Sequence, residues 1–221
     1  MTEFKHIVTE EDKAQELDIK GIMRQHFKFS SRLRNKIKRE KLIRLNGKET
    51  PNWIKPEPGD IVSIKLPQEK SEFEAENIPI DIAYEDKDLL IINKQPYIVV
   101  HPTKGHPTGT LTNAIMYHIN ETNQTFKIRF MNRLDRDTSG LMVYAKTIEA
   151  EQILEHNWHN IVTDRRYIAL CSGKPQQPQG SVESWLKDNK AYFTFSSPTD
   201  NGGKFAVTHY KTLKGNGKYT L

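Results

Sequence analysis

The chain of 221 residues has very little cysteine and no long apolar segment. Its only cysteine is Cys171, so no disulfide can form within the chain, and a reducing, cytoplasmic location is expected. No apolar run approaches the length that spans a bilayer, and the N-terminus lacks the apolar core of a signal peptide. The composition therefore argues against a membrane protein and against a disulfide-stapled scaffold.

The sequence also lacks a convincing metal or phosphate site. His101 and His106 are five residues apart on a proline-rich loop, and further ligands are missing there. His156 and His159 have helical spacing, but Cys171 alone does not complete a zinc set. The glycine-containing loops have no phosphate-cradling pattern. We therefore expect no metal.

Positive charge is concentrated in the first third of the chain. Residues 1–70 contain 16 Lys and Arg against 11 Asp and Glu, a difference equal to the whole formal charge of +5. Such a patch is typical of proteins that bind the phosphate backbone of nucleic acids, although a solvated basic helix has the same composition. The predicted contacts to such a phosphate backbone are Arg32, Arg34, Lys36, Lys38, Arg39, Lys41 and Arg44.

The basic patch falls on a predicted amphipathic helix over residues 30–43. Ser30 or Ser31 can cap the start of this helix, and Leu33 and Ile37 lie on its apolar side. The patterns I-R-L-N-G and P-G-D-I-V-S-I-K-L then predict strands separated by turns. This order resembles the small RNA-binding domain named after a ribosomal small-subunit protein, over about residues 18–67. We predict that domain at residues 1–67, followed by a solvated acidic linker at residues 68–79.

Residues 80–221 alternate short strands and helices, which predicts an α+β fold with a mixed or antiparallel sheet. Helices are expected at 111–119 and 147–158, strands at 88–93, 141–145, 166–171, 181–185 and 191–195, and a hairpin at 207–221. The chain ends at Leu221, inside the second strand of that hairpin. Because native domains rarely stop at such a point, we expect the chain to be a fragment.

The most densely charged segment is R-L-D-R-D-T-S-G-L at residues 133–141, directly before an apolar strand. Charges at the entrance to a buried strand are costly unless they pair with one another or serve a site. The segment therefore indicates either a self-neutralising surface turn or a functional loop. A glycosidase pair of Asp135 and Asp137 is disfavoured, because nothing in the sequence resembles a sugar-binding aromatic platform.

This segment resembles the signature loop of the ribosomal large-subunit pseudouridine synthase family (the RluA family). Two further segments match it: residues 91–102 resemble N-K-P-x-G-x-x-V-H-P, and residues 165–170 resemble K-x-Y-x-A. The chain departs from the family at Gln95-Pro96-Tyr97, which displaces the usual Pro and Gly, and at Asn132, where the family usually has His. A later motif, G-R-x-H-Q-I-R, is absent, which predicts that this chain by itself can be inactive.

The resemblance implies a pseudouridine synthase catalytic domain at residues 80–221, incomplete at its C-terminal side. Asp135 is the implied catalytic residue, a buried aspartate that acts as nucleophile or as proton acceptor. It must stay ionised, and Arg133 and Arg136 are local candidates for a guanidinium that favours its charged form. Arg133 is implied to fill the space of a flipped base, and Tyr167 to contact the uracil and possibly accept a proton at its hydroxyl. The remaining implied substrate contacts are Arg136, His101, Asn132, Thr138 and Arg165.

The implied reaction breaks the N1–C1′ bond of uridine and joins C5 to C1′. Because nothing is reduced, hydrolysed or added, no cofactor is expected. The expected partner is RNA, with ribosomal RNA preferred to transfer RNA, and a monomer is expected. The alternative is a non-catalytic RNA-binding or ribosome-assembly factor with the same fold. The displaced Pro and Gly and the absent motif favour this alternative, whereas the intact R-L-D opposes it.

Overall fold

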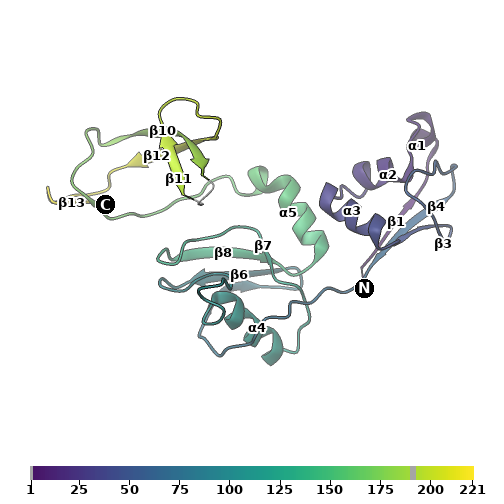
Figure 1. Cartoon of the computed structure of the whole chain (residues 1–221), viewed down its shortest axis with the longest axis horizontal. Helices are drawn as coiled ribbons and strands as arrows, with labels where there is room; N and C mark the ends of the chain where they lie inside the picture. The colour runs from purple at the N-terminus through teal and green to yellow at the C-terminus, as the bar shows by residue number, and fades with distance from the viewer. Residues whose placement is uncertain (1, 190–192) are drawn as a thin grey trace. The chain divides into compact units, whose positions relative to one another are not determined.

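The computed structural model describes residues 2–189 and 193–221, and it divides into two compact units, Met1–Val162 and Thr163–Leu221. The division falls inside the predicted catalytic domain of residues 80–221. The predicted domain boundaries at residues 67 and 80 therefore have no counterpart in it, and they stay a prediction. Figure 1 labels the elements of both units.

The N-terminal part of the larger unit is an antiparallel sheet with helices on one face (Figure 1). The strands follow the order β1-β4-β2-β3. Their bounds are Thr2–Ile7 for β1, Ile43–Leu45 for β2, Lys48–Glu49 for β3 and Ile61–Leu66 for β4. The helices are α1 (Glu10–Ala14), α2 (Ile19–Gln25) and α3 (Ser31–Arg39).

Helix α3 carries much of the basic patch, and it begins where the sequence predicts. Ser30 is the N-cap, and its hydroxyl accepts a hydrogen bond from the backbone N–H of Leu33. Ile37 is fully buried in a core with the β2 and β4 residues Ile43 and Ile64. The helix ends at Arg39 rather than at residue 43, and Lys41 turns the chain with a positive φ of 52°. The predicted helix was thus one turn too long.

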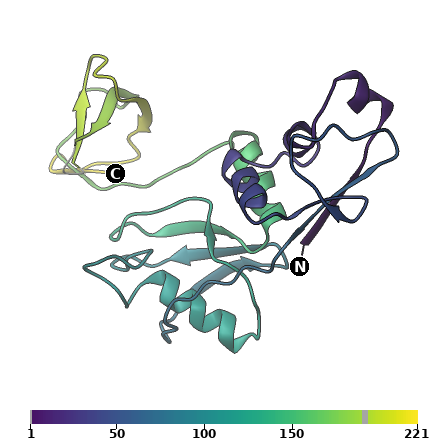
Figure 2. The same cartoon turned by 45° about the vertical axis from the view of Figure 1, so that its right-hand side comes forward.

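The second sheet of the larger unit has the strand order β5-β6-β8-β7, with every pair antiparallel. Its strands are β5 (Asp81–Glu85), β6 (Leu89–Lys94), β7 (Arg129–Phe130) and β8 (Gly140–Ala145). Helix α4 (Leu111–Glu121) lies along one face of this sheet in both views (Figures 1 and 2). The core between them is apolar, and it includes Leu90, Ile92, Leu111, Ile115, Met142 and Tyr144.

Helix α5 (Ile148–Ile161) follows β8, and Thr147 caps it as the sequence predicts. The hydroxyl of Thr147 accepts a hydrogen bond from the backbone N–H of Ala150 at 3.2 Å. Ala150 and Leu154 are buried, whereas Ile153 on the predicted apolar stripe is mostly exposed. None of the helices formed by the described residues is long and apolar enough to cross a membrane.

The segment of residues 68–79 has no helix or strand, but it is not solvated as predicted. Phe73 and Ile78 pack against the core of the second sheet. The carboxylate of Glu69 lies 2.6 Å from the guanidinium of Arg129 and also pairs with Lys36 and Lys127. One acidic residue of this segment, Glu69, therefore ties it to its neighbours through ion pairs. Composition alone does not distinguish such a segment from a solvated linker.

The smaller unit is built only from strands among its described residues. Its elements are β9 (Cys171–Ser172), β10 (Gln179–Asp188), β11 (Thr194–Ser197), β12 (Lys204–Lys211) and β13 (Tyr219–Thr220). They form a sheet of order β11-β10-β12 and a pair β13-β9. The α+β class is thus confirmed for the described chain, with antiparallel ladders throughout rather than a mixed sheet.

Three predictions for this unit need correction or fall partly outside the described residues. The strand predicted at 166–171 is absent, because residues 163–170 pair with no other segment and only Cys171–Ser172 form β9. The predicted hairpin is found only at its tip, where backbone hydrogen bonds join Leu213 and Lys214 to Leu221. The longer strands pair elsewhere, β12 with β10 and β13 with β9. The strand predicted at 191–195 is found as Thr194–Ser197, while residues 191 and 192 lie outside the described part of the chain.

The ion pairs of Glu69 yield a stability prediction. Replacing Glu69 with Ala leaves the guanidinium of Arg129, which is 5% exposed, without its nearest carboxylate. The carboxylate of Glu151, 3.0 Å from Nε of Arg129, remains. We expect the free energy of unfolding of the larger unit to fall by about 2 kcal/mol in urea titrations, because a buried guanidinium loses one of its two carboxylate partners. Glu72→Ala is the matched control, since Glu72 is exposed and pairs only with exposed Lys70; it should change stability by less than about 0.5 kcal/mol. Equal effects of the two substitutions would contradict the role given to Glu69.

Candidate active site

The signature loop joins β7 to β8, and its base is held by backbone and amide hydrogen bonds. The backbone N–H of Met131 donates to the carbonyl of Val143 at 3.0 Å. The side-chain amide of Asn132 donates to the carbonyl of Leu141 at 3.1 Å, and its oxygen accepts from the N–H of Val143 at 2.8 Å. Asn132, predicted as a substrate contact, thus uses both ends of its amide to fasten the loop to β8.

The tip of the loop presents charged side chains to solvent. Arg133, Asp135, Arg136 and Asp137 are all exposed, so the expectation of a buried Asp135 is wrong. The backbone N–H of Thr138 donates to the carbonyl of Asp135 at 3.2 Å, which closes a tight turn under the carboxylate. The loop therefore holds the backbone of Asp135 while leaving its side chain accessible.

Arg136 is engaged with Asp137 rather than with Asp135. Its guanidinium donates to both carboxylate oxygens of Asp137, at 2.8 and 3.2 Å. This hydrogen-bonded pair holds the pKa of Asp137 below its usual range and raises the pKa of Arg136. Among the described residues, neither Arg133 nor Arg136 forms an ion pair with Asp135. The local arginines predicted as partners for Asp135 do not take that role here.

A buried lysine supports the loop from the neighbouring strand. Lys94 is the last residue of β6 and is fully buried, and its ammonium donates to the carbonyl of Arg136 at 3.0 Å. It also donates to the carbonyl of Gln95 at 2.9 Å. Burial lowers the pKa of Lys94, and the nearby carboxylates of Asp137 and Asp135 partly offset that effect. The positive charge of Lys94 also favours the ionised form of Asp137.

Lys94 lies opposite Gly140 in the ladder between β6 and β8. Gly140 begins β8 with a φ of +128°, a backbone conformation that favours glycine. The G of R-L-D-R-D-T-S-G-L therefore has a structural reason: it lets the chain turn from the loop into the strand at the point where Lys94 is buried.

His101 lies beside the strand that leads into the loop. Its ring makes edge contacts with Phe73 and Phe130, with ring centroids 5.2 and 5.5 Å apart. Phe130 ends β7 and contacts Tyr144 of β8 in turn. The structure therefore links His101 to the base of the loop by aromatic packing while the residue as a whole stays exposed.

The other two predicted substrate contacts lie in the smaller unit. Arg165 and Tyr167 are on the irregular segment before β9, and the side chain of Tyr167 is 65% exposed. Both residues line a cavity of about 980 Å³ within this unit, together with residues of β12 such as His209. Asp135 and Tyr167 thus belong to different units, and their predicted cooperation stays a prediction.

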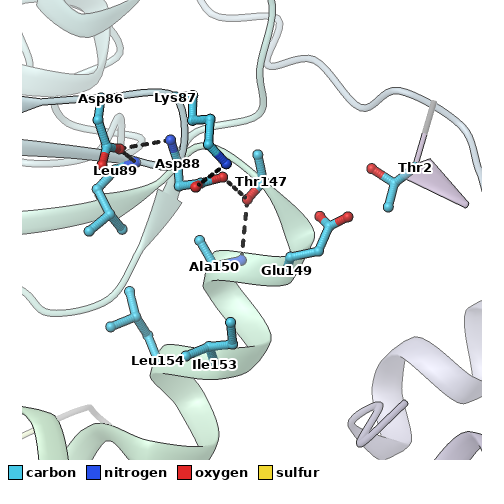
Figure 3. A pocket seen from close by; sticks show the side chains of 10 residues that line it. All are labelled: Thr2, Asp86, Lys87, Asp88, Leu89, Thr147, Glu149, Ala150, Ile153 and Leu154. Carbon is cyan, nitrogen blue, oxygen red and sulfur yellow. Dashed lines mark hydrogen bonds and ion pairs between the residues drawn. The ribbon is translucent and has the colours of Figure 1, made fainter. Parts of the chain in front are cut away.

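A second cavity, of about 460 Å³, lies at the start of α5 and away from these residues (Figure 3). Asp86, Asp88 and Thr147 line it, and hydrogen bonds among the lining groups already engage them: Asp86 accepts from the N–H groups of Asp88 and Leu89, and Thr147 bonds to Asp88. None of the predicted site residues lines this cavity. It is therefore not part of the candidate site.

Comparison with known proteins places this geometry in a family. The sequence profile described as RNA pseudouridylate synthase matches residues 88–221, which is more than half of the chain. The chain belongs to the RNA pseudouridylate synthase family. The matched residues include the loop that carries Asp135, the lysine that supports this loop, Lys94, and the segment that carries Tyr167.

Individual relatives agree with this placement. An uncharacterized RNA pseudouridine synthase of Aquifex aeolicus is 32% identical over 220 residues, which cover 96% of this chain and 68% of the relative. One from Bacillus subtilis is 35% identical and covers 76% of this chain and 60% of the relative. Ribosomal large subunit pseudouridine synthase D of Haemophilus influenzae is 39% identical and covers 69% of this chain and 47% of the relative. The chain thus spans about half to two thirds of the length of these relatives.

The structure also explains one departure from the family pattern. In N-K-P-x-G-x-x-V-H-P, the position of the glycine corresponds to Tyr97. Tyr97 has a φ of +65° and a side chain that is largely exposed. The backbone therefore keeps the left-handed conformation that the family glycine serves, and this chain places a tyrosine there at a conformational cost of about 1–2 kcal/mol.

The burial of Lys94 under the signature loop was not predicted, although the strand pattern around it indicates a buried position. The pattern L-L-I-I-N-K alternates along a strand, so Lys94 shares a face with Leu90 and Ile92, both of which are buried. A lysine on the buried face of a strand must find hydrogen-bond acceptors. Extending the alternation of Leu90 and Ile92 by two residues predicts that the side chain of Lys94 is buried in the core.

The support from Lys94 leads to a prediction about the loop. Lys94→Met keeps the length of the side chain but leaves the carbonyls of Arg136 and Gln95 without their donor. We expect the backbone N–H of Thr138 to exchange with deuterium at least about tenfold faster, because the loop opens more easily. Lys87→Met, at an exposed lysine before the same strand, is the control and should leave that rate unchanged. Equal rates in Lys94→Met and the unsubstituted protein would contradict the supporting role.

Proposed function

We propose that this protein isomerises uridines in structured RNA to pseudouridine, with Asp135 as the catalytic residue. The observation that carries the proposal is an exposed aspartate on a loop fastened by Asn132 and Lys94, inside the segment that matches the family. A pre-positioned carboxylate that solvent can reach is also one that a ribose can reach. Such fixed geometry is what catalysis by a single carboxylate requires.

The chemistry follows from the bonds exchanged. The N1–C1′ bond of the uridine breaks, the base turns within the site, and C5 joins C1′. C5 then loses its proton and N1 gains one, so the product is an isomer of the substrate. Asp135 acts at the ribose, as a nucleophile at C1′ or as a proton acceptor. The reaction changes no oxidation state and adds no group, so its balance needs no co-reactant.

The target base must leave its stack to reach a carboxylate on a protein surface. Unstacking a base costs a few kcal/mol, which the protein recovers through contacts with the flipped base and with the gap that it leaves. We assign Arg133 to the gap, since its guanidinium is exposed beside Asp135 in the sequence. We assign Tyr167 to the face of the uracil, where stacking contributes about 1–3 kcal/mol. Arg136, His101, Thr138 and Arg165 complete the proposed substrate contacts.

Ribosomal RNA is the proposed substrate, and the cytoplasm the proposed location. Support comes from the similarity to relatives that are named ribosomal large subunit pseudouridine synthase D, such as those of Haemophilus influenzae and Escherichia coli. RNA enzymes of this kind select a target by the shape of the RNA and the presentation of a loop. The basic charge of the first 70 residues suits such a substrate.

The N-terminal 67 residues are the proposed RNA-binding domain, with a smaller set of backbone contacts than the sequence predicts. Arg32, Lys38 and Lys41 are exposed and form no ion pair among the described residues. Lys36 pairs with Glu69, and the side chains of Arg34, Arg39 and Arg44 bond within the protein. The free cations of α3 and of the turn after it are therefore the better candidates for phosphate contacts.

Replacing Asp135 with Asn tests the catalytic assignment. The substitution keeps the size of the side chain and removes its charge, so we expect turnover to fall by at least about 1,000-fold while RNA affinity is retained. Turnover is measured as tritium release from RNA that contains 5-tritiated uridine, with the product of the full reading frame that encodes this chain. Asp137→Asn is the control, because Asp137 has the same exposure and pairs with Arg136; it should lose far less activity.

The same assay separates the enzyme from the non-catalytic alternative. Tritium release that Asp135→Asn abolishes supports the enzyme. Tight RNA binding without release by either protein would instead establish an RNA-binding or assembly factor with this fold. Normal release by Asp135→Asn would show that another residue is catalytic.

The RNA-binding assignment yields a second test. Lys38→Gln should weaken RNA binding and reduce the slope of log affinity against log salt by about 1, because one phosphate contact is lost. Lys36→Gln lies on the same helix but removes a lysine that pairs with Glu69. We expect Lys36→Gln to leave the salt slope unchanged in filter-binding titrations. A similar loss of slope in both proteins would contradict the distinction between paired and free lysines.

A further inference from the structure

Two histidines and one aspartate converge in the N-terminal sheet domain, far in the sequence from the signature loop. His6 lies on β1, Asp12 on α1, and His26 caps the end of α2. One ligand atom from each of the three lies within 4.8 Å of the others. The two imidazole rings stack with centroids 3.8 Å apart and an angle of 21° between their planes. The side chains of this cluster therefore connect three separate elements, β1, α1 and α2.

Both rings direct the same nitrogen at the carboxylate. Nε2 of His6 lies 2.7 Å from Oδ2 of Asp12, and Nε2 of His26 lies 2.6 Å from Oδ1. The backbone N–H and the hydroxyl of Thr9 also donate to Oδ2, at 2.8 and 3.0 Å. Among the described residues, His26 is the only hydrogen-bond partner of Oδ1. Thr9 thus orients the carboxylate, with Oδ2 facing His6 and Oδ1 facing His26.

The charge of Asp12 has no lysine or arginine beside it within the described chain. Asp12 is 3% exposed, and its only ion-pair partners there are the two histidines. A carboxylate removed from water needs hydrogen-bond donors or a cation to replace its hydration. Both kinds of partner are compatible with the two imidazole nitrogens and the Thr9 donors around Asp12.

We propose that His6, Asp12 and His26 form a binding site for a divalent transition metal, Zn²⁺ in the first place. Two imidazole nitrogens and one carboxylate oxygen are ligands that Zn²⁺ takes, and three protein ligands leave a fourth position for water. An imidazole-rich set disfavours Mg²⁺ and Ca²⁺, which prefer oxygen ligands alone. The hydrogen bonds from Thr9 to Asp12 match the outer-shell contacts that orient ligating carboxylates.

The geometry needs only a small adjustment to accept the ion. Zn–N and Zn–O distances of about 2.0–2.2 Å place neighbouring ligand atoms about 3.3 Å apart in a tetrahedral site. The observed separations of 2.6 and 2.7 Å between nitrogen and oxygen must therefore open by about 0.6–0.7 Å. His26 can make this movement, because its side chain is 35% exposed and sits at the end of α2. Its exposure also gives the ion a path of entry.

The metal would join β1, α1 and α2 in the domain that also carries the basic helix α3 (Figure 1). The expectation of no metal rested on other histidines, since His6 and His26 are too far apart in the sequence to suggest a common site. The two rings meet only in the folded chain, where β1 is paired with β4 and the ring of His26 at the end of α2 stacks on the ring of His6.

The test uses the untagged 221-residue chain after treatment with a chelator, and Zn²⁺ alone as the probe. We expect one equivalent of Zn²⁺ by dialysis and elemental analysis, and a rise in melting temperature of roughly 5 °C at a hundredfold excess over the dissociation constant. Co²⁺ in its place should give the intense visible absorption of a tetrahedral N/O site. His26→Gln keeps a hydrogen-bond donor for Asp12 but removes the imidazole, so Zn²⁺ affinity should fall more than about 100-fold.

His118→Gln is the matched control, because the ring of His118 bonds to the carboxylate of Glu85 at 2.8 Å without a third ligand. It should bind Zn²⁺ like the unsubstituted chain. If the unsubstituted chain binds no more Zn²⁺ than His26→Gln, the cluster is a hydrogen-bonded support and the proposal is overturned. Equal tight binding by both would place the metal elsewhere and overturn it as well.

Discussion

The ladder between β6 and β8 is the interaction on which the candidate site depends. It pairs every residue from Leu89 to Lys94 with one from Ala145 to Gly140, and it lies at the centre of the sheet that α4 covers. The same ladder places the ammonium of Lys94 beside the start of β8, where the signature loop ends. The position of Asp135 is therefore set by the pairing of two buried strands rather than by contacts of its own side chain.

The larger unit contains buried charged side chains in addition to its apolar core. Lys94, Arg129 and Asp12 are each nearly inaccessible to solvent, and each sits among several polar partners. Lys94 bonds to backbone carbonyls, Arg129 to carboxylates, and Asp12 to imidazoles and a backbone N–H. Removing a partner from any of them leaves an unsatisfied group in a low dielectric, so these positions tolerate fewer changes than their exposed neighbours.

Local signals predicted the elements well where they depend on neighbouring residues. Ser30 and Thr147 cap helices as expected, and the Asn46-Gly47 turn adopts positive φ at both residues. The Ile61–Leu66 strand is found with the bounds that its alternation predicts. These features arise from capping chemistry and backbone preference, which a short window of sequence contains.

Features that depend on distant partners were predicted poorly. The run R-Y-I-A-L has strong strand character, yet residues 166–170 form no ladder, because strand formation needs a second strand. The acidic segment at residues 68–79 looked solvated, since sequence does not reveal that Arg129 and Lys36 lie beside Glu69. Asp135 was expected to be buried, and its exposure follows from a turn that Lys94 and Asn132 hold.

The most direct test of pseudouridine formation at Asp135 is a map of pseudouridines in cellular RNA. Pseudouridine has the same mass as uridine, so carbodiimide labelling read by reverse transcription is suited to the comparison. Cells that carry the unsubstituted gene should show one or a few sites in ribosomal RNA that disappear when the gene encodes Asp135→Asn. A pseudouridine map unchanged by that substitution would contradict the assignment.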